Sequence, residues 1–112
     1  AEKALVDVEL ESLNLFKLLQ TFQQLMRRYE EDMNKPKHQI VKFDYTLENQ
    51  QRYILGKLPK GKKVNFEHIF LALENRIHAI VTFIALLEML NLQIVELIQG
   101  EGVNNFWLMS KN

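Results

Sequence analysis

One continuous apolar segment limits what this chain can fold into. Residues 77–90 read IHAIVTFIALLEML, and only His78, Thr82 and Glu88 interrupt the apolar run. A helix that is apolar around its whole circumference must be covered on more than one side. At about 1.5 Å per residue the segment extends only roughly 21 Å, which is short of the roughly 30 Å hydrocarbon core of a bilayer. The segment therefore predicts the central helix of a small globular core.

Two short apolar segments follow this helix and predict a β-hairpin. LQIVELIQ and FWLM flank the turn-like sequence GEGVNN, which is typical of two strands joined by a loop. Period-2 alternation sorts their side chains onto two faces, of which one lies on the helices. The inner set is Val95, Leu97, Phe106 and Leu108. The outer set is Ile94, Glu96, Ile98, Trp107 and Met109.

Composition and charge exclude several classes of protein. The 112 residues, 47% hydrophobic and 25% charged, are ordinary for one globular domain. A net charge of +0 gives no overall bias toward polyanions or membrane surfaces, although residues 34–63 hold eight basic and two acidic side chains. The absence of cysteine excludes disulfides and thiolate metal sites and fits a reducing cytoplasm. The sequence shows no signal peptide and no transmembrane run. It opens without an initiating Met, which suggests part of a longer protein.

An amphipathic pattern precedes the core. Apolar residues recur at spacings of three and four between Leu15 and Met33, which predicts one long helix with a broad apolar stripe. Two interpretations are open: the stripe packs on the domain's own core, or the helix extends past the domain and presents the stripe to another protein. The contact residues in the second case are Leu15, Leu18, Phe22, Leu25 and Tyr29. Without a partner, we expect either a homodimer through this helix or a helix folded back on the domain.

The middle of the chain predicts a linker and two shorter helices. Pro36 ends the first helix, and residues 34–45 should be an extended linker. Thr46 then caps a helix that stops at Pro59. Residues 64–66 should form a very short strand or staple, and residues 67–73 a short helix. The expected core places Phe83, Leu86, Leu87 and Leu90 against Ile54, Phe66 and Phe70.

These elements predict a mainly α fold, a winged helix-turn-helix with three helices and a β-hairpin wing, preceded by a long amphipathic helix. The expected boundaries are 1–33 for the lead-in and amphipathic helix, 34–45 for the linker and 46–112 for the winged-helix domain.

Nucleic-acid binding and catalysis find little support. The sequence KLPKGKK offers Lys60, Lys62 and Lys63 as phosphate contacts, but a solvated loop is the better explanation of this turn. The 77–90 helix lacks the Arg, Lys, Asn or Gln side chains that read base edges. The three histidines have no metal-ligand spacing. No nucleophile or phosphate-cradling loop is recognisable. We therefore expect no enzyme, no cofactor and no metal.

Several segments resemble one family. VTFIALLEMLNLQIVELIQGEGVNNFWL, residues 81–108, is similar to the C-terminal winged helix of segregation and condensation protein A, the bacterial kleisin, whose pattern begins VTFLALLEL. FEHIF at residues 66–70 resembles FEELF, which opens the family's second helix. LNLFKLLQTF at residues 13–22 resembles LDLYDLLEAF in its middle region. The resemblance covers nearly the whole chain.

This resemblance implies a non-enzymatic subunit of the bacterial chromosome condensation and segregation complex. The family's winged helix docks on the ATPase head of a structural-maintenance-of-chromosomes (SMC) protein, and its middle region binds segregation and condensation protein B (ScpB). The family's amino-terminal domain is missing here, so this chain should not close the ring. The resemblance also implies a nucleoid-associated cytoplasmic location, contact with DNA only through the complex, and no membrane contact.

The predicted outer face of the hairpin is too apolar for bare solvent. Two explanations are open: the amino-terminal segment or the chain's tail covers it, or a partner does. In the second case Glu96, Ile98, Trp107 and Met109 contribute to docking of the SMC head. The alternative function is that of a winged-helix DNA-binding transcription regulator using the lysine-rich turn and the wing.

Overall fold

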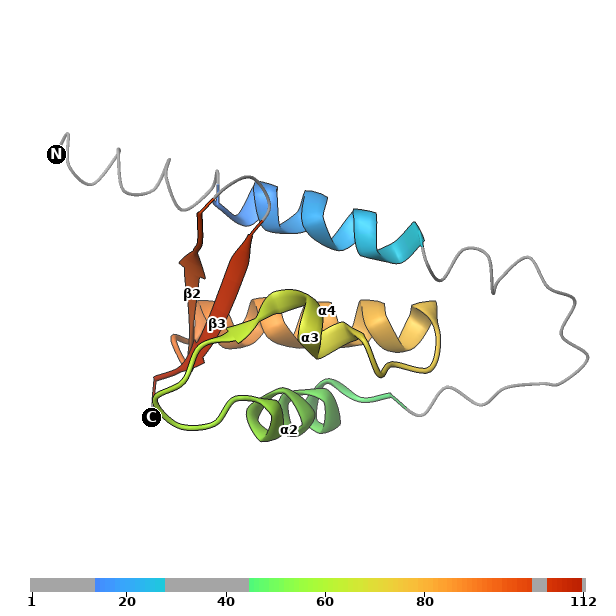
Figure 1. Cartoon of the computed structure of the whole chain (residues 1–112). Helices are drawn as coiled ribbons and strands as arrows, with labels where there is room; N and C mark the ends of the chain where they lie inside the picture. The colour runs from blue at the N-terminus through green and yellow to red at the C-terminus, as the bar shows by residue number, and fades with distance from the viewer. Residues whose placement is uncertain (1–13, 28–44, 102–104, 112) are drawn as a thin grey trace, which may run out of the picture.

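The computed structural model describes residues 14–27, 45–101 and 105–111 (Figure 1). Residues 14–27 are helical and form the amino-terminal helix. The elements that follow are α2 (Leu47–Lys57), β1 (Val64–Asn65), α3 (Phe66–Phe70), α4 (Arg76–Asn91), β2 (Val95–Gln99) and β3 (Phe106–Ser110). The predicted continuation of the first helix to Met33 and the linker up to residue 44 lie outside the described residues.

The predicted central helix is confirmed as α4. The side chain of Asn75 caps it by accepting a hydrogen bond from the backbone N–H of His78. At its other end the N–H of Gln93 donates to Leu90 O and that of Ile94 to Met89 O, the two bonds of a Schellman motif. Gln93 takes the left-handed conformation, φ 61°, that this motif requires.

The buried face of α4 differs in part from the expected one. Its buried residues are Ala79, Thr82, Phe83, Ala85, Leu86 and Met89. Leu87 and Leu90, also expected in the core, are only partly buried but pack against it. The other expected core residues, Ile54, Phe66 and Phe70, are buried. These positions follow Phe83 and Leu86 at helical spacings of three and four and share their face of α4, but Leu87 and Leu90 line the pocket beside β2, which leaves them partly exposed.

The sheet has three strands rather than the two of a simple hairpin. β3 lies between β1 and β2, and both neighbours are antiparallel to it. The predicted sorting of side chains is confirmed for the inner face, where Val95, Phe106 and Leu108 are buried and Leu97 packs partly against the core. Three helices beside a small antiparallel sheet are compatible with the expected winged helix (Figure 1).

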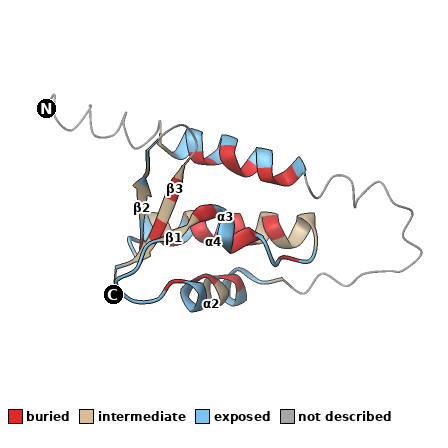
Figure 2. Ribbon diagram, in the orientation of Figure 1, coloured by how far each residue is buried: buried red, intermediate tan, exposed pale blue. Residues whose placement is uncertain are grey.

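The amino-terminal helix lies along the domain and shares its core. Its inward residues are buried while its other side is exposed (Figure 2). The Phe22 ring stacks on Phe83 at 4.1 Å between centroids and lies 5.4 Å from Phe70. The interpretation that the stripe packs on the domain's own core therefore holds for these residues, and of the two expected arrangements the helix shows the folded-back one.

Buried polar groups tie the helices together. Gln50 of α2 donates from Nε2 to Thr82 Oγ1 of α4 at 2.6 Å, and Thr82 Oγ1 donates to His78 O at 2.7 Å. The Tyr53 hydroxyl donates to Ile69 O at 2.7 Å, which joins α2 to α3. A buried polar group without a partner is costly, so these pairs help to fix one arrangement of the helices.

Candidate protein-interaction surfaces

The outer face of the sheet brings the predicted docking residues together. Strand pairing sets Ile98 opposite Trp107 and Glu96 opposite Met109. Paired residues project on the same side of a sheet, so these four side chains form one patch, called the outer face below. Glu96 is exposed and the other three are partly exposed. Asn65 of β1, opposite Trp107, extends the patch by one strand.

The indole of Trp107 lies beside Gly100 and near Lys63 on this face. A Cβ built on Gly100 would lie 2.6 Å from Trp107 Nε1, so only glycine leaves room for the ring there. The Lys63 ammonium lies 5.5 Å from the ring centroid, within cation–π range. Sequence reasoning found Trp107 but missed both Gly100 and the role of Lys63.

The predicted partner residues of the amino-terminal helix divide into two groups. Leu18, Phe22 and Leu25 are buried in the domain's own core, Leu15 is 44% exposed, and Tyr29 lies outside the described residues. The exposed side also carries Phe16 at 57% and Leu19 at 40% exposure. Phe16 does not follow the three-and-four spacing of the stripe, which was the available signal that it faces outward.

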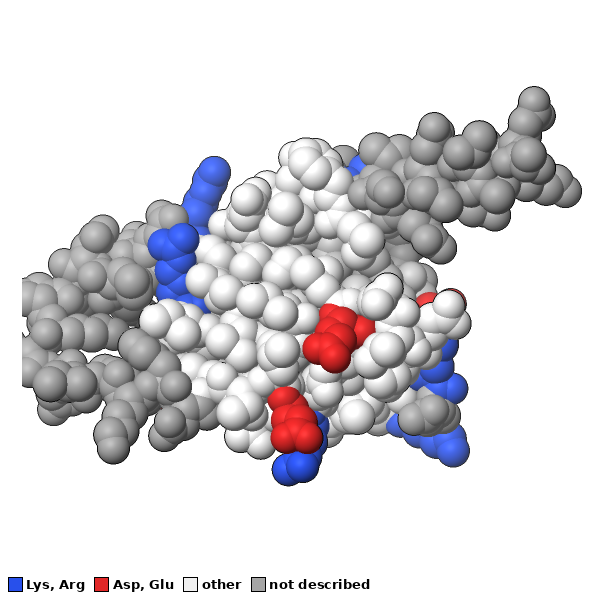
Figure 3. All heavy atoms as spheres, turned by 180° about the vertical axis from the view of Figure 1, so that it is seen from behind, with Lys and Arg blue, Asp and Glu red and all other residues white. Residues whose placement is uncertain are grey.

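This exposed apolar side belongs to a weakly charged region of the surface. Seen from behind, a broad face of the molecule shows few Lys, Arg, Asp or Glu side chains (Figure 3). Ile84, on the outward side of α4, is 46% exposed.

The three candidate phosphate contacts all lie in the turn between α2 and β1. Lys60, Lys62 and Lys63 are exposed, and Lys63 already lies over Trp107. In the DNA-binding alternative α4 would be the recognition helix, but the amino-terminal helix covers it through the Phe22–Phe83 stack. The geometry therefore does not favour reading of base edges by α4.

A polar cluster surrounds the start of α4. The Tyr45 ring stacks on His78 at 4.1 Å between centroids, and its hydroxyl donates to Glu74 Oε2 at 2.6 Å. The backbone N–H of Glu74 donates to His78 Nδ1 at 3.2 Å. Burial lowers the pKa of His78 against an opposing effect of the Glu74 carboxylate, and the hydrogen bond to Glu74 chiefly raises the pKa of Tyr45. The contacts attach Tyr45, two residues before α2, to the start of α4.

Neither a metal centre nor a membrane span is found in the described parts of the chain. No group of three or more His, Asp or Glu side chains lies close enough together to hold a metal ion there. None of the helices described is both long and apolar enough to cross a bilayer.

Comparison with known proteins gives one consistent family. A family model described as Segregation and condensation protein ScpA matches residues 2–109. Segregation and condensation protein A of Listeria welshimeri is 28% identical over 102 residues, covering 88% of this chain and 40% of the relative. Its counterparts in Clostridium botulinum and Halalkalibacterium halodurans are 29% and 28% identical and cover 84% and 88% of this chain. The chain spans about two fifths of the length of these relatives.

Proposed function

Because this chain belongs to the segregation and condensation protein ScpA family, we propose that it is a non-enzymatic subunit acting in chromosome segregation and condensation. The match of the family model over residues 2–109 carries the proposal. The apolar, partly exposed outer face of the sheet supports a role in binding rather than in catalysis. In this proposal the protein works in the cytoplasm at the nucleoid and reaches DNA through its complex, without membrane contact.

The first proposed partner is the ATPase head of an SMC protein. The domain acts as a winged helix whose outer face, with Ile98, Trp107, Glu96 and Met109, docks on the head. A partly exposed Trp next to aliphatic side chains is the composition typical of binding hot spots. Glu96 and Lys63 at opposite sides of this patch provide charges that restrict the orientation of the partner.

The second proposed partner is the accessory protein ScpB, bound through the amino-terminal helix. Contact through Leu18, Phe22 and Leu25 requires the helix to leave the core, because these residues are buried. Leu15, with Phe16 and Leu19, is accessible while the helix stays packed. We therefore assign the contact to this exposed side.

Binding to the SMC head is tested with Ile98→Glu combined with Trp107→Glu. We expect at least about a hundredfold weaker binding, because two anchor side chains are replaced by charges that would be desolvated. Leu55→Glu on α2, where Leu55 is 40% exposed, is the matched control and should bind as the parent does. A double variant that remains folded by circular dichroism and binds the head normally would falsify the docking face.

The DNA-binding alternative is separated by a salt titration with duplex DNA. Micromolar affinity at physiological salt, with a steep fall as salt rises, would favour it. Our proposal expects no such binding by this domain alone.

A further inference from the structure

One edge of the sheet, formed by β2, lies beside a pocket. β2 pairs with β3 on one side, and no strand of the described chain lies on its other side. Free edges of this kind accept an added strand unless side chains or loops block them. The edge of β2 is therefore open to pairing with an extended segment.

The strand register shows which backbone groups point outward. Gly100 N donates to Asn105 O at 2.7 Å, and Lys111 N donates to Ile94 O at 3.0 Å, at the two ends of the β2–β3 ladder. Hydrogen-bonded pairs alternate along antiparallel strands, so Ile94, Glu96, Ile98 and Gly100 bond to β3. Val95, Leu97 and Gln99 consequently point their N–H and C=O groups away from the sheet.

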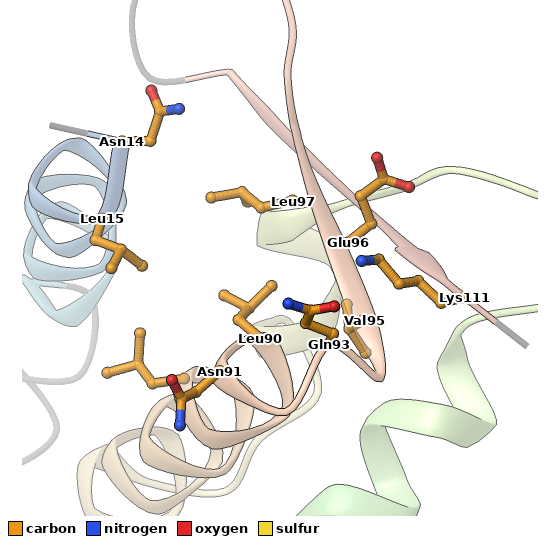
Figure 4. A pocket seen from close by; sticks show the side chains of 10 residues that line it. Asn14, Leu15, Leu90, Asn91, Gln93, Val95, Glu96, Leu97 and Lys111 are labelled. Atoms are coloured by element: carbon orange, nitrogen blue, oxygen red, sulfur yellow. The ribbon is translucent and has the colours of Figure 1, made fainter. Parts of the chain in front are cut away.

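The pocket lies below this edge, on the inner side of the sheet. It has a volume of about 580 Å³ and lies between the amino-terminal helix, the end of α4 and β2. Leu15, Leu90 and Leu97 point toward one another from these three elements (Figure 4). Glu96 and Lys111 bring one charge of each sign to the rim, so the pocket has no net charge, and Asn14, Asn91 and Gln93 add uncharged polar groups around the leucines.

Edge and pocket together define a ligand. A residue that exchanges hydrogen bonds with Val95 or Leu97 projects its side chain on the same face as they do, which is the face of the pocket. Alternate side chains of an added strand therefore enter the pocket, while those between them face outward. We propose that this groove binds an extended segment of a partner protein by strand addition to β2, with apolar side chains at every second position.

The rim connects the groove to the proposed docking surface. Glu96 lines the pocket and also belongs to the outer face. A protein that covers the outer face is therefore positioned to place one of its extended segments in the groove. This choice of partner rests on the proposed function. Pairing of two copies through the five residues of β2 would bury much less than the roughly 1,200 Å² of a stable interface. The neutral groove suits an uncharged segment.

The probe is the peptide acetyl-Thr-Val-Thr-Leu-Thr-Val-Thr-amide added to the full chain, followed by NMR and amide exchange. In the free protein the N–H groups of Val95, Leu97 and Gln99 should exchange fast and that of Ile98 slowly. Peptide binding should slow the first three. N-methylation of the peptide's Leu amide, which faces β2, should abolish binding, whereas N-methylation of a neighbouring Thr amide should be tolerated.

Two variants test the groove itself. Leu15→Asp places a charge in the pocket and should weaken peptide binding about tenfold or more. Leu55→Asp, with similar exposure on α2, should leave the affinity within about twofold. Gln99→Pro removes one outward N–H without breaking a bond to β3 and should also weaken binding.

Three results would overturn the proposal. One is peptide affinity that neither Leu15→Asp nor Gln99→Pro changes. Another is that the Val95, Leu97 and Gln99 amides are protected in the free chain and lose this protection when residues 1–13 are deleted. That result would mean that the intact chain fills its own groove. The last is protection that grows with protein concentration, which would identify a second copy as the occupant. Because no SMC head is present, failure here leaves the docking face untouched.

Discussion

Gln93 turns the chain from α4 into β2 at a position that favours glycine. Its φ of 61° is unfavourable for a residue with a Cβ, at a cost of roughly 1–2 kcal/mol. Gln93→Gly should therefore raise the free energy of unfolding by about 0.5–1 kcal/mol, after allowance for the greater entropy of glycine in the unfolded chain. Urea denaturation measures this. The control Gln99→Gly, within β2, should lower stability, and a loss in both variants would contradict the argument.

His78 makes stability depend on pH. Its neutral Nδ1 accepts the Glu74 N–H, and burial lowers its pKa below the ordinary 6.5. The unfolded chain therefore binds the proton more readily than the folded one. The stabilisation is complete above about pH 6.5 and is lost as the pH falls from there toward the lower pKa of the folded protein.

The measurement compares unfolding free energies of the parent and His78→Gln between pH 7.5 and 5. The parent should lose more stability on acidification than the variant, since Gln does not titrate. Equal losses would show that His78 is protonated as readily in the folded protein as in the unfolded one.

Two neighbouring leucines on α4 test the orientation of this element. Leu86 is 0% exposed, whereas Leu87 lies at the pocket and is partly buried. Leu86→Ala should lower the free energy of unfolding by about 2–5 kcal/mol, because it removes buried apolar atoms and leaves an enclosed cavity. Leu87→Ala should cost less than about 2 kcal/mol, because solvent already reaches one side and no closed cavity remains. The reverse order of losses, in thermal or urea unfolding, would mean that the helix is rotated.

The amino-terminal helix should unfold together with the whole domain. Phe22 belongs to an aromatic cluster with Phe66, Phe70 and Phe83, so Phe22→Ala should cost about 3–5 kcal/mol, and Phe16→Ala on the exposed side close to nothing. Circular dichroism and Trp107 fluorescence should give coincident transitions. Fast amide exchange over residues 14–27 alone would instead support the predicted boundary between residues 1–33 and the rest.

Local sequence patterns determined most of the elements. The apolar run predicted α4, and Thr46 was predicted to cap α2, as it does. Strict alternation predicted the inner face of β2 and β3. Each of these depends on interactions between residues near in sequence or on a simple period, which a single chain displays directly. The Trp107 patch was predictable for the same reason.

Only the tertiary structure decided what covers each apolar surface. The stripe of the amino-terminal helix fits an external partner as well as its own core, because periodicity defines an apolar face without naming its neighbour. The Phe22–Phe83 stack settled this for the buried residues. The pairing of β1 with β3 and the groove beside β2 likewise join residues distant in the chain. Such contacts depend on packing in three dimensions, which no local pattern specifies.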